Sequence, residues 1–114
     1  IFKIEAKKRI YFGKKLQEIL KNFSLSKEKN TKIAYNTFPI LVENRKKIIK
    51  KLKKHKIEYA TYYPIPIHKQ KIISSNININ LKITEKFCKN IINIPVHPYI
   101  DQKYLLKIKS IFEN

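Results

Sequence analysis

Two proline-framed segments hold histidines on stiff stretches of backbone and are the strongest chemical signal in the sequence. The first runs Tyr63-Pro64-Ile65-Pro66-Ile67-His68-Lys69-Gln70, and the second runs Ile94-Pro95-Val96-His97-Pro98-Tyr99. Proline fixes φ and pushes the preceding residue into an extended conformation, so each segment is predicted to form a stiff loop. An imidazole on such a loop can hydrogen-bond an anionic or hydroxylated ligand in a cleft, or it can bond the backbone. The residues alone leave both interpretations of His68 open, whereas His97 is expected to be structural.

The other chemically active residues do not form a self-contained catalytic or metal centre. Gly13 is the only glycine, which excludes glycine-rich phosphate-binding and dinucleotide-binding loops. The histidines at positions 55, 68 and 97 lack metal-ligand spacing, and no local carboxylate is placed to assist them. Cys88 is the only cysteine, which excludes an internal disulfide, and we expect it to pack as a small apolar side chain on a helix. We therefore predict no catalytic, cofactor-binding or metal-ligating residue in this segment by itself.

The elements that must position the first loop lie upstream of it. Apolar residues spaced as on one helix face predict a helix over residues 3–22, followed by a polar connection over 24–31. Residues 33–42 are rich in β-formers, and the proline among them indicates an edge strand or a bulge. Asn44 is a good N-cap for a helix that continues to residue 54, and residues 57–62 are predicted to form a second strand.

Four further segments are expected between the first loop and the C-terminus. Alternating isoleucine and asparagine in residues 71–82 permits either a strand or an irregular connection. Residues 83–92 are expected to form a helix, which Pro95 ends, and residues 94–97 a short strand. Asp101 is predicted to cap a final helix. Helices that alternate with short strands predict an α/β domain, in which a few short strands pack with about four helices.

The chain is strongly basic, which makes nucleic-acid binding an alternative function. Its 114 residues carry 26 lysines and arginines against 8 aspartates and glutamates, for a formal net charge of +18. Only Arg9 and Arg45 are arginines, although recognition of phosphates and base edges favours the bidentate guanidinium. The lysines are spread over every predicted helix face, and the bias toward Lys, Asn and Ile is typical of an AT-rich genome. We therefore expect the charge to be compositional background, with a small basic nucleic-acid-binding protein as the alternative.

Location and completeness can also be predicted from composition. No apolar run approaches the length needed to cross a bilayer, and no signal peptide is visible, so we expect no membrane partner. A single cysteine favours a reducing compartment, and we expect a cytoplasmic location. The sequence contains no methionine and begins at Ile1, so we expect a segment or an incomplete gene product.

Residues 62–70, Tyr-Tyr-Pro-Ile-Pro-Ile-His-Lys-Gln, resemble the Tyr-Pro-x-Pro-Leu-His-x-Gln segment of the DegT/DnrJ/EryC1/StrS aminotransferases. Residues 94–98, Ile-Pro-Val-His-Pro, are similar to that family's Leu-Pro-Ile-His-Pro strand. Glu85 falls where the family has a glutamate that opens a helix, and the Asn44-Arg45 pair resembles the start of another family helix. The resemblance covers nearly the whole chain.

Three positions depart from the family pattern. Lys56 stands where a glycine usually ends the helix, Lys82 replaces a common proline, and Asn36 stands where a histidine is frequent. A lysine at position 56 loses the easy left-handed cap that glycine provides. These departures indicate a divergent member.

The resemblance implies that residues 1–114 are the single C-terminal small domain of a fold-type I, pyridoxal-phosphate-dependent aminotransferase, without its N-terminal large domain. That large domain carries the Schiff-base lysine, so pyridoxal phosphate would be bound only by the complete enzyme. The complete homodimer would transfer an amino group from a donor to a nucleotide-linked keto sugar, in cell-surface polysaccharide or amino-sugar biosynthesis. Tyr63, His68 and Gln70 would bind the substrate. The segment would be inactive alone, and a non-catalytic truncated remnant is a further alternative.

Overall fold

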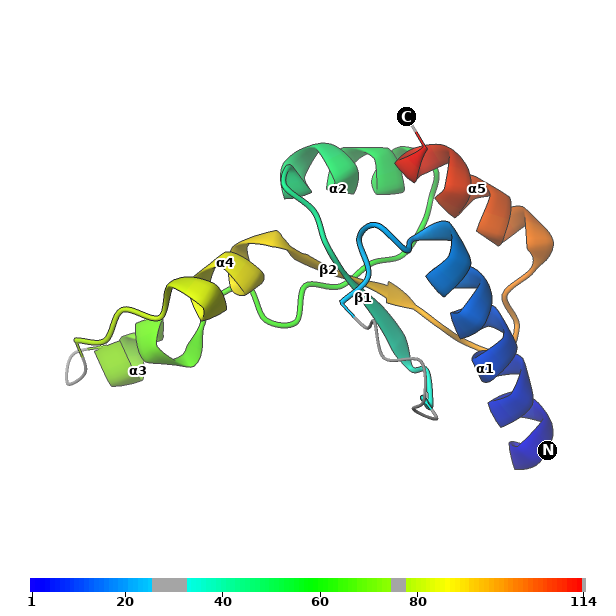
Figure 1. Cartoon of the computed structure of the whole chain (residues 1–114), viewed down its shortest axis with the longest axis horizontal. Coiled ribbons are helices and arrows are strands. Elements are labelled where there is room, and N and C mark those ends of the chain that lie inside the picture. Colours follow the sequence, from blue (N-terminus) through cyan, green and yellow to red (C-terminus); the bar gives the residue numbers. More distant parts are fainter. Residues whose placement is uncertain (26–32, 75–77, 114) are drawn as a thin grey trace.

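The sheet at the centre of this chain has two antiparallel strands, one from each half of the sequence. The computed structural model describes residues 1–25, 33–74 and 78–113 (Figure 1). In chain order, the elements are α1 (Phe2–Ile19), β1 (Thr37–Leu41), α2 (Arg45–Lys54), the 3₁₀ turn η1 (Ile67–Lys69), α3 (Lys71–Ser74), α4 (Lys82–Asn90), β2 (Ile91–Pro95) and α5 (Gln102–Phe112). Figure 1 shows two parts: a body built from α1, β1, α2, β2 and α5, and a projecting arm, residues 62–74 and 78–90, that carries η1, α3 and α4.

One face of the sheet is wholly apolar. Phe38 of β1 pairs with Ile94 of β2, and Ile40 pairs with Ile92. Cross-strand partners point to the same face, so these four side chains form one surface, and each is at most 2% exposed. The other face carries Asn93, which lies opposite Pro39. The two faces of the sheet therefore differ in chemistry.

The helices α1, α2 and α5 cover the apolar face of the sheet (Figure 1). The buried residues that they and the turn after α1 contribute to the core are Leu16, Leu20, Leu52, Leu105, Ile108 and Ile111. Two of these helices have side-chain N-caps, because Asn44 accepts a hydrogen bond from the Lys47 N–H and Asp101 accepts one from the Tyr104 N–H. The predicted helices that start after these caps, and their apolar faces, are confirmed.

Both arginines tie elements together through backbone carbonyls. The Arg9 guanidinium of α1 donates to the Val96 carbonyl at 2.6 Å, and that of Arg45 in α2 donates to the Cys88 carbonyl in α4 at 2.7 Å. Charge-assisted hydrogen bonds of this kind are stronger than neutral ones. The first bond joins α1 to the end of β2, and the second joins the arm to the body.

The predicted α/β class is confirmed, but the strand predicted over residues 57–62 is absent, and the strand predicted over 94–97 lies at Ile91–Pro95. Residues 57–62 form no strand: only Ala60 reaches β2, where it exchanges two backbone hydrogen bonds with Asn93. The chain then leaves the sheet toward Pro64, which has no N–H for a ladder. The helix predicted over 83–92 ends at Asn90, because Ile91 and Ile92 already belong to β2.

Two predicted connections overlap positions outside the described residues. Part of the segment 24–31 and residues 75–77 of the segment 71–82 lie there, while residues 71–74 form the single turn α3. Across the described part of the chain, no helix is long and apolar enough to cross a membrane. The same residues contain no group of three His, Cys, Asp or Glu side chains that could hold a metal ion.

Gly13 is required where α1 crosses an aromatic ring, because a Cβ at this position would overlap the ring of Tyr35. We predict that Gly13→Ala lowers the free energy of unfolding by about 1 kcal/mol in chemical denaturation. Overpacking typically costs about 1–3 kcal/mol, whereas alanine gains only about 1 kcal/mol in helix propensity.

Two further variants test whether the ring is the cause. Lys14→Ala, at the next and exposed position of α1, should not destabilise the chain. In a Tyr35→Leu background, Gly13→Ala should stabilise the chain instead. A Gly13→Ala chain at least as stable as the original would contradict the assigned overlap.

Candidate functional site

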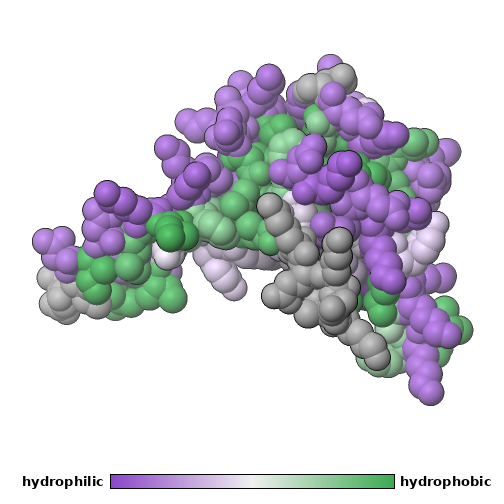
Figure 2. All heavy atoms as spheres, in the orientation of Figure 1, coloured by the Kyte–Doolittle hydropathy of each residue, from purple (hydrophilic) through white to green (hydrophobic). Residues whose placement is uncertain are grey.

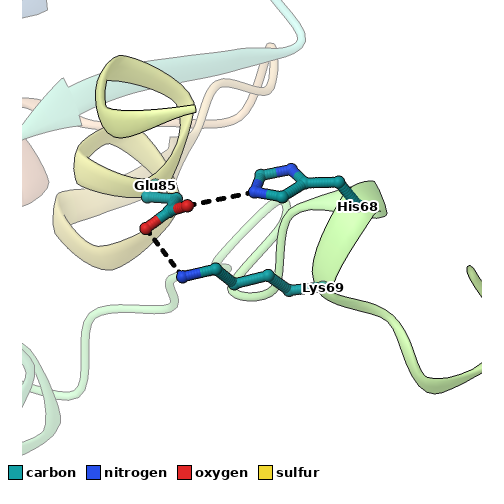
Figure 3. A network of polar contacts seen from close by, with 3 residues as sticks. All are labelled: His68, Lys69 and Glu85. Atoms are coloured by element: carbon teal, nitrogen blue, oxygen red, sulfur yellow. Dashed lines mark hydrogen bonds and ion pairs between the residues drawn. The ribbon is translucent and has the colours of Figure 1, made fainter. Parts of the chain in front are cut away.

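The first proline loop is fastened to α4 by one carboxylate. His68 lies in η1, two residues after Pro66, and is only 9% exposed. Its Nε2 lies 3.1 Å from Oε1 of Glu85, and the Nζ of Lys69 lies 2.7 Å from Oε2 of the same side chain (Figure 3). We call this three-residue cluster the Glu85 clasp. The carboxylate that meets His68 is therefore not a local one, because it comes from α4, 17 positions away in the sequence.

The clasp lowers the pKa of its carboxyl group. The hydrogen bond from Lys69, followed by that from His68, holds the pKa of Glu85 below its ordinary value. An ionised carboxylate can only accept hydrogen bonds, so Nε2 of His68 carries the proton between them. In the neutral imidazole Nδ1 is then an acceptor, and any ligand that it meets must offer a donor such as a hydroxyl group.

The three residues predicted to bind substrate share one segment but differ in environment. Tyr63 is 72% exposed, and its ring packs against that of Tyr62 at a centroid distance of 5.7 Å. Gln70 also has an exposed side chain, while its backbone N–H closes η1 on the Ile67 carbonyl. His68 instead turns inward toward α4. Tyr63 and Gln70 are thus accessible to a ligand, and His68 is mostly enclosed.

The second proline segment forms a turn held by its own histidine. Nδ1 of His97 accepts a hydrogen bond from the Tyr99 N–H at 3.3 Å, and the Tyr99 hydroxyl donates to Glu5 of α1 at 3.1 Å. The hydrogen bond from Tyr99 to Glu5 raises the pKa of the Tyr99 hydroxyl. These contacts fit the structural role expected of His97.

A cavity of about 670 Å³ lies against the face of the sheet that carries Asn93. Arg9, Thr37, Glu58, His97 and Asn93 are among its lining residues. Asn93 is only 5% exposed, and its Nδ2 has no hydrogen-bond acceptor among the described residues. A buried donor without a partner is costly, so this amide marks the cavity as a place where a polar group fits. Sequence reasoning missed Asn93, although one asparagine inside the apolar run Ile91–Pro95 was a usable signal.

The described lysines do not provide a pyridoxal-phosphate site. A Schiff-base lysine needs a desolvated pocket beside the cofactor. Every lysine whose placement the structure describes is at least partly exposed. The residues present therefore do not fit this cofactor, and whether the segment binds it alone stays a prediction.

The sequence matches one family over almost its whole length. The model of the DegT/DnrJ/EryC1/StrS aminotransferase family matches residues 4–112. A curated relative is UDP-2-acetamido-2-deoxy-3-oxo-D-glucuronate aminotransferase from Pseudomonas aeruginosa, 28% identical over 74 residues, which are 65% of this chain and 20% of that protein.

Solved structures share the fold. A DegT/DnrJ/EryC1/StrS aminotransferase from Brucella abortus superposes with a TM-score of 0.83 at 23% identity, over 96% of this chain and 30% of its own. NtdA from Bacillus subtilis, whose structure holds the cofactor PMP, superposes with a TM-score of 0.76 at 20% identity, over 96% of this chain and 28% of its own. The chain thus spans between a fifth and a third of the length of these proteins.

The Glu85 clasp predicts how the pKa of the Glu85 carboxyl changes when Lys69 is replaced. Lys69→Gln removes the larger cause of the lowered pKa of Glu85, so the carboxyl should titrate at a higher pH, closer to an ordinary glutamate. Carbon-13 NMR of the Glu85 carboxyl measures this directly. Lys86→Gln, which changes a neighbouring exposed lysine of α4, should leave the pKa much closer to that of the unchanged chain. Equal shifts in both variants would contradict the assigned hydrogen bond.

The same clasp makes stability depend on pH. A carboxyl whose pKa is lower in the folded chain than in the unfolded chain stabilises the fold fully above its unfolded pKa, about 4.3, and loses this contribution as the pH falls through the folded value. Glu85→Gln should therefore be less stable than the original chain at pH 6, and the difference should shrink as the pH falls below about 4. Thermal unfolding at several pH values tests this, and a difference that grows toward acid would contradict it.

Proposed function

The chain belongs to the DegT/DnrJ/EryC1/StrS aminotransferase family, and from this premise we propose that it is the C-terminal small domain of a PLP-dependent sugar aminotransferase. In the complete enzyme it closes one side of a cleft in which an amino group passes to a nucleotide-linked keto sugar. The observation that carries the proposal is the family match over residues 4–112, which includes both proline segments.

The proposal divides the tasks of the complete enzyme between this chain and another part of the polypeptide. No described lysine is buried, so we assign the Schiff-base lysine to another part of the polypeptide. The span of 20–30% of the relatives' lengths fits one domain of a longer enzyme. We place the N-terminal large domain before this chain in the complete protein, which would act as a homodimer. The cofactor, when bound there, supplies the amino-group carrier.

The residues of the proline loop have distinct roles in this proposal. The exposed Tyr63 and Gln70 contact the substrate directly. His68 presents Nδ1 as an acceptor for a substrate hydroxyl, while Glu85 and Lys69 fix the ring and its tautomer through Nε2. The prolines at 64 and 66 hold this stretch extended, so little conformational entropy is lost when a ligand binds.

Nucleic-acid binding, the alternative function, gains no support from the arginines. Arg9 and Arg45 each use a guanidinium N–H on a backbone carbonyl within the chain. Both therefore have a structural role, and neither is a freely extended side chain of the kind that reads base edges.

A chimeric enzyme tests the proposal. Residues 1–114 replace the matching C-terminal part of the Pseudomonas aeruginosa relative, and transamination of its UDP-linked sugar is measured. We expect the chimera to be active, and the 114-residue chain alone to show neither transamination nor a Schiff-base absorption band. A Schiff-base band from the chain alone would overturn the proposal, and a folded but inactive chimera would favour the non-catalytic remnant.

Side-chain variants of the active chimera test the loop. Tyr63→Ala should lower kcat/KM by about tenfold, which corresponds to about 1.4 kcal/mol, the size of one lost hydrogen bond. Tyr99→Ala is a matched control, because Tyr99 is similarly exposed, at 76% against 72%, but lies outside this loop. Equal losses in both variants would remove Tyr63 from the substrate site.

A further inference from the structure

The helix α4 leads directly into β2, and its own side chains do not hold it against the body. None of its residues is buried, and none of the described apolar side chains that pack on the core belongs to it. Figure 1 shows the helix running away from β2 into the arm. The joint between the two elements is Ile91, whose extended backbone, with ψ at 136°, ends the helix. Apolar packing therefore does not set the angle between α4 and the sheet.

Among the described residues, two hydrogen bonds join α4 to the body. The Val42 N–H donates to the Asn90 carbonyl at 3.1 Å, at the last residue of the helix. The Arg45 guanidinium donates to the Cys88 carbonyl at 2.7 Å. Both carbonyls belong to the last turn, where the helix itself offers no N–H partner, and a cation at this end is also favoured by the helix dipole. The bond from Val42 lies at the joint itself, so the angle of α4 depends on Arg45.

Arg45 itself belongs to the fixed part of the structure. It is the first residue of α2, directly after the N-cap Asn44, and the same helix buries Leu52 in the core. Its side chain is partly buried. The guanidinium is thus a donor that the body holds in place, and α4 is the element that it orients.

The orientation of α4 also sets the place of the first proline loop. Glu85 lies three residues before Cys88, about one helical turn, and its carboxylate holds His68 and Lys69. Among the described residues, no backbone hydrogen bond joins residues 61–66 to the body. After Ala60, which pairs with β2, the loop is therefore positioned through α4 and the Glu85 clasp.

A small rotation of α4 is enough to displace the loop. Glu85 lies five residues before Asn90, which is about 7.5 Å along the helix axis. A rotation of about 10° around the end of the helix thus moves Glu85 by about 1 Å. A misplacement of about 1 Å in a site can cost about 100-fold in rate, even where the altered residue lies far from the chemistry.

We propose that Arg45 is a positioning residue for the substrate site: it sets the angle of α4 and, through the Glu85 clasp, the place of the first proline loop. This role needs no contact between Arg45 and the substrate. The inference rests on the proposed function for what the loop binds, whereas the action of Arg45 on α4 is independent of that function.

Residual dipolar couplings of the backbone N–H groups measure the orientation of α4 in the 114-residue chain. Arg45→Met removes the donor, so α4 should reorient relative to α2 and α5, while those two helices keep their mutual orientation. Lys46→Met is the matched control, because Lys46 is the next residue of α2, is exposed and loses the same charge. It should leave all three orientations unchanged. Arg45→Lys keeps the charge and one ammonium donor, so it should reorient α4 less, and it serves as the test where Arg45→Met unfolds the chain.

Kinetics of the active chimera test the link to the loop. Arg45→Met should raise KM for the UDP-linked sugar about tenfold and change kcat less than twofold, because a displaced loop weakens the binding of substrate and transition state alike. Lys46→Met should change neither constant. A role in stability alone would instead reduce the amount of active enzyme, and so lower the apparent kcat at an unchanged KM.

The two measurements separate this inference from the proposed function. An α4 that keeps its orientation in the Arg45 variants would overturn the inference, whatever the chimera does. So would an active chimera whose KM is unchanged although α4 has moved, or equal effects of Arg45→Met and Lys46→Met. An unmodified chimera without activity would count against the proposed function alone, and the dipolar couplings would still decide whether Arg45 sets the angle of α4.

Discussion

The burial of one face of a two-stranded sheet is the constraint on which the rest of the structure depends. An isolated pair of strands is only marginally stable in water. Here Phe38, Ile40, Ile92 and Ile94 form a continuous apolar surface, and α1, α2 and α5 remove it from water. Each buried side chain of this size contributes about 1.5–3 kcal/mol, far more than any cap or surface ion pair in the chain. The helices stabilise the sheet, and the sheet in turn fixes where the arm leaves the body.

The arm depends on a small number of polar contacts at its base. Arg45 holds the Cys88 carbonyl of α4, and the exchange of hydrogen bonds between Ala60 and Asn93 holds the chain as it enters the arm. The Glu85 clasp then closes the proline loop onto α4. The proline loop thus lies on a segment whose position is set by directional bonds, whereas the body is held by apolar packing. Of the contacts that hold the arm, the Glu85 clasp responds to pH, whereas the apolar burial in the body responds to temperature.

Local signals in the sequence were enough to predict much of the body. Asn44 and Asp101 predicted their helices correctly, because a side-chain cap acts within one helical turn. The strand predicted over residues 57–62 was wrong, because only Ala60 finds a hydrogen-bonding partner on a neighbouring strand. Whether such a partner is present depends on the whole fold and not on the β-forming residues themselves. The predicted end of the helix at residue 92 was wrong for a related reason. Ile91 and Ile92 fit the apolar face of a helix, but they pair with β1 as the first residues of β2. The clasp joins residues 17 positions apart, a separation that no local pattern reports.

The arm exposes apolar side chains on a chain that carries a large positive charge, so its tendency to self-associate should depend on ionic strength. Among the described residues, most of the large apolar side chains left in water lie on the arm, and Figure 2 shows them gathered along its lower edge. At low ionic strength a net charge of +18 keeps two copies too far apart for these surfaces to meet. Salt shortens the reach of that repulsion, from a Debye length of about 30 Å at 0.01 M to about 3 Å at 1 M. We therefore expect concentrated salt to let the arms of different copies associate, because the charge of the lysines is then screened.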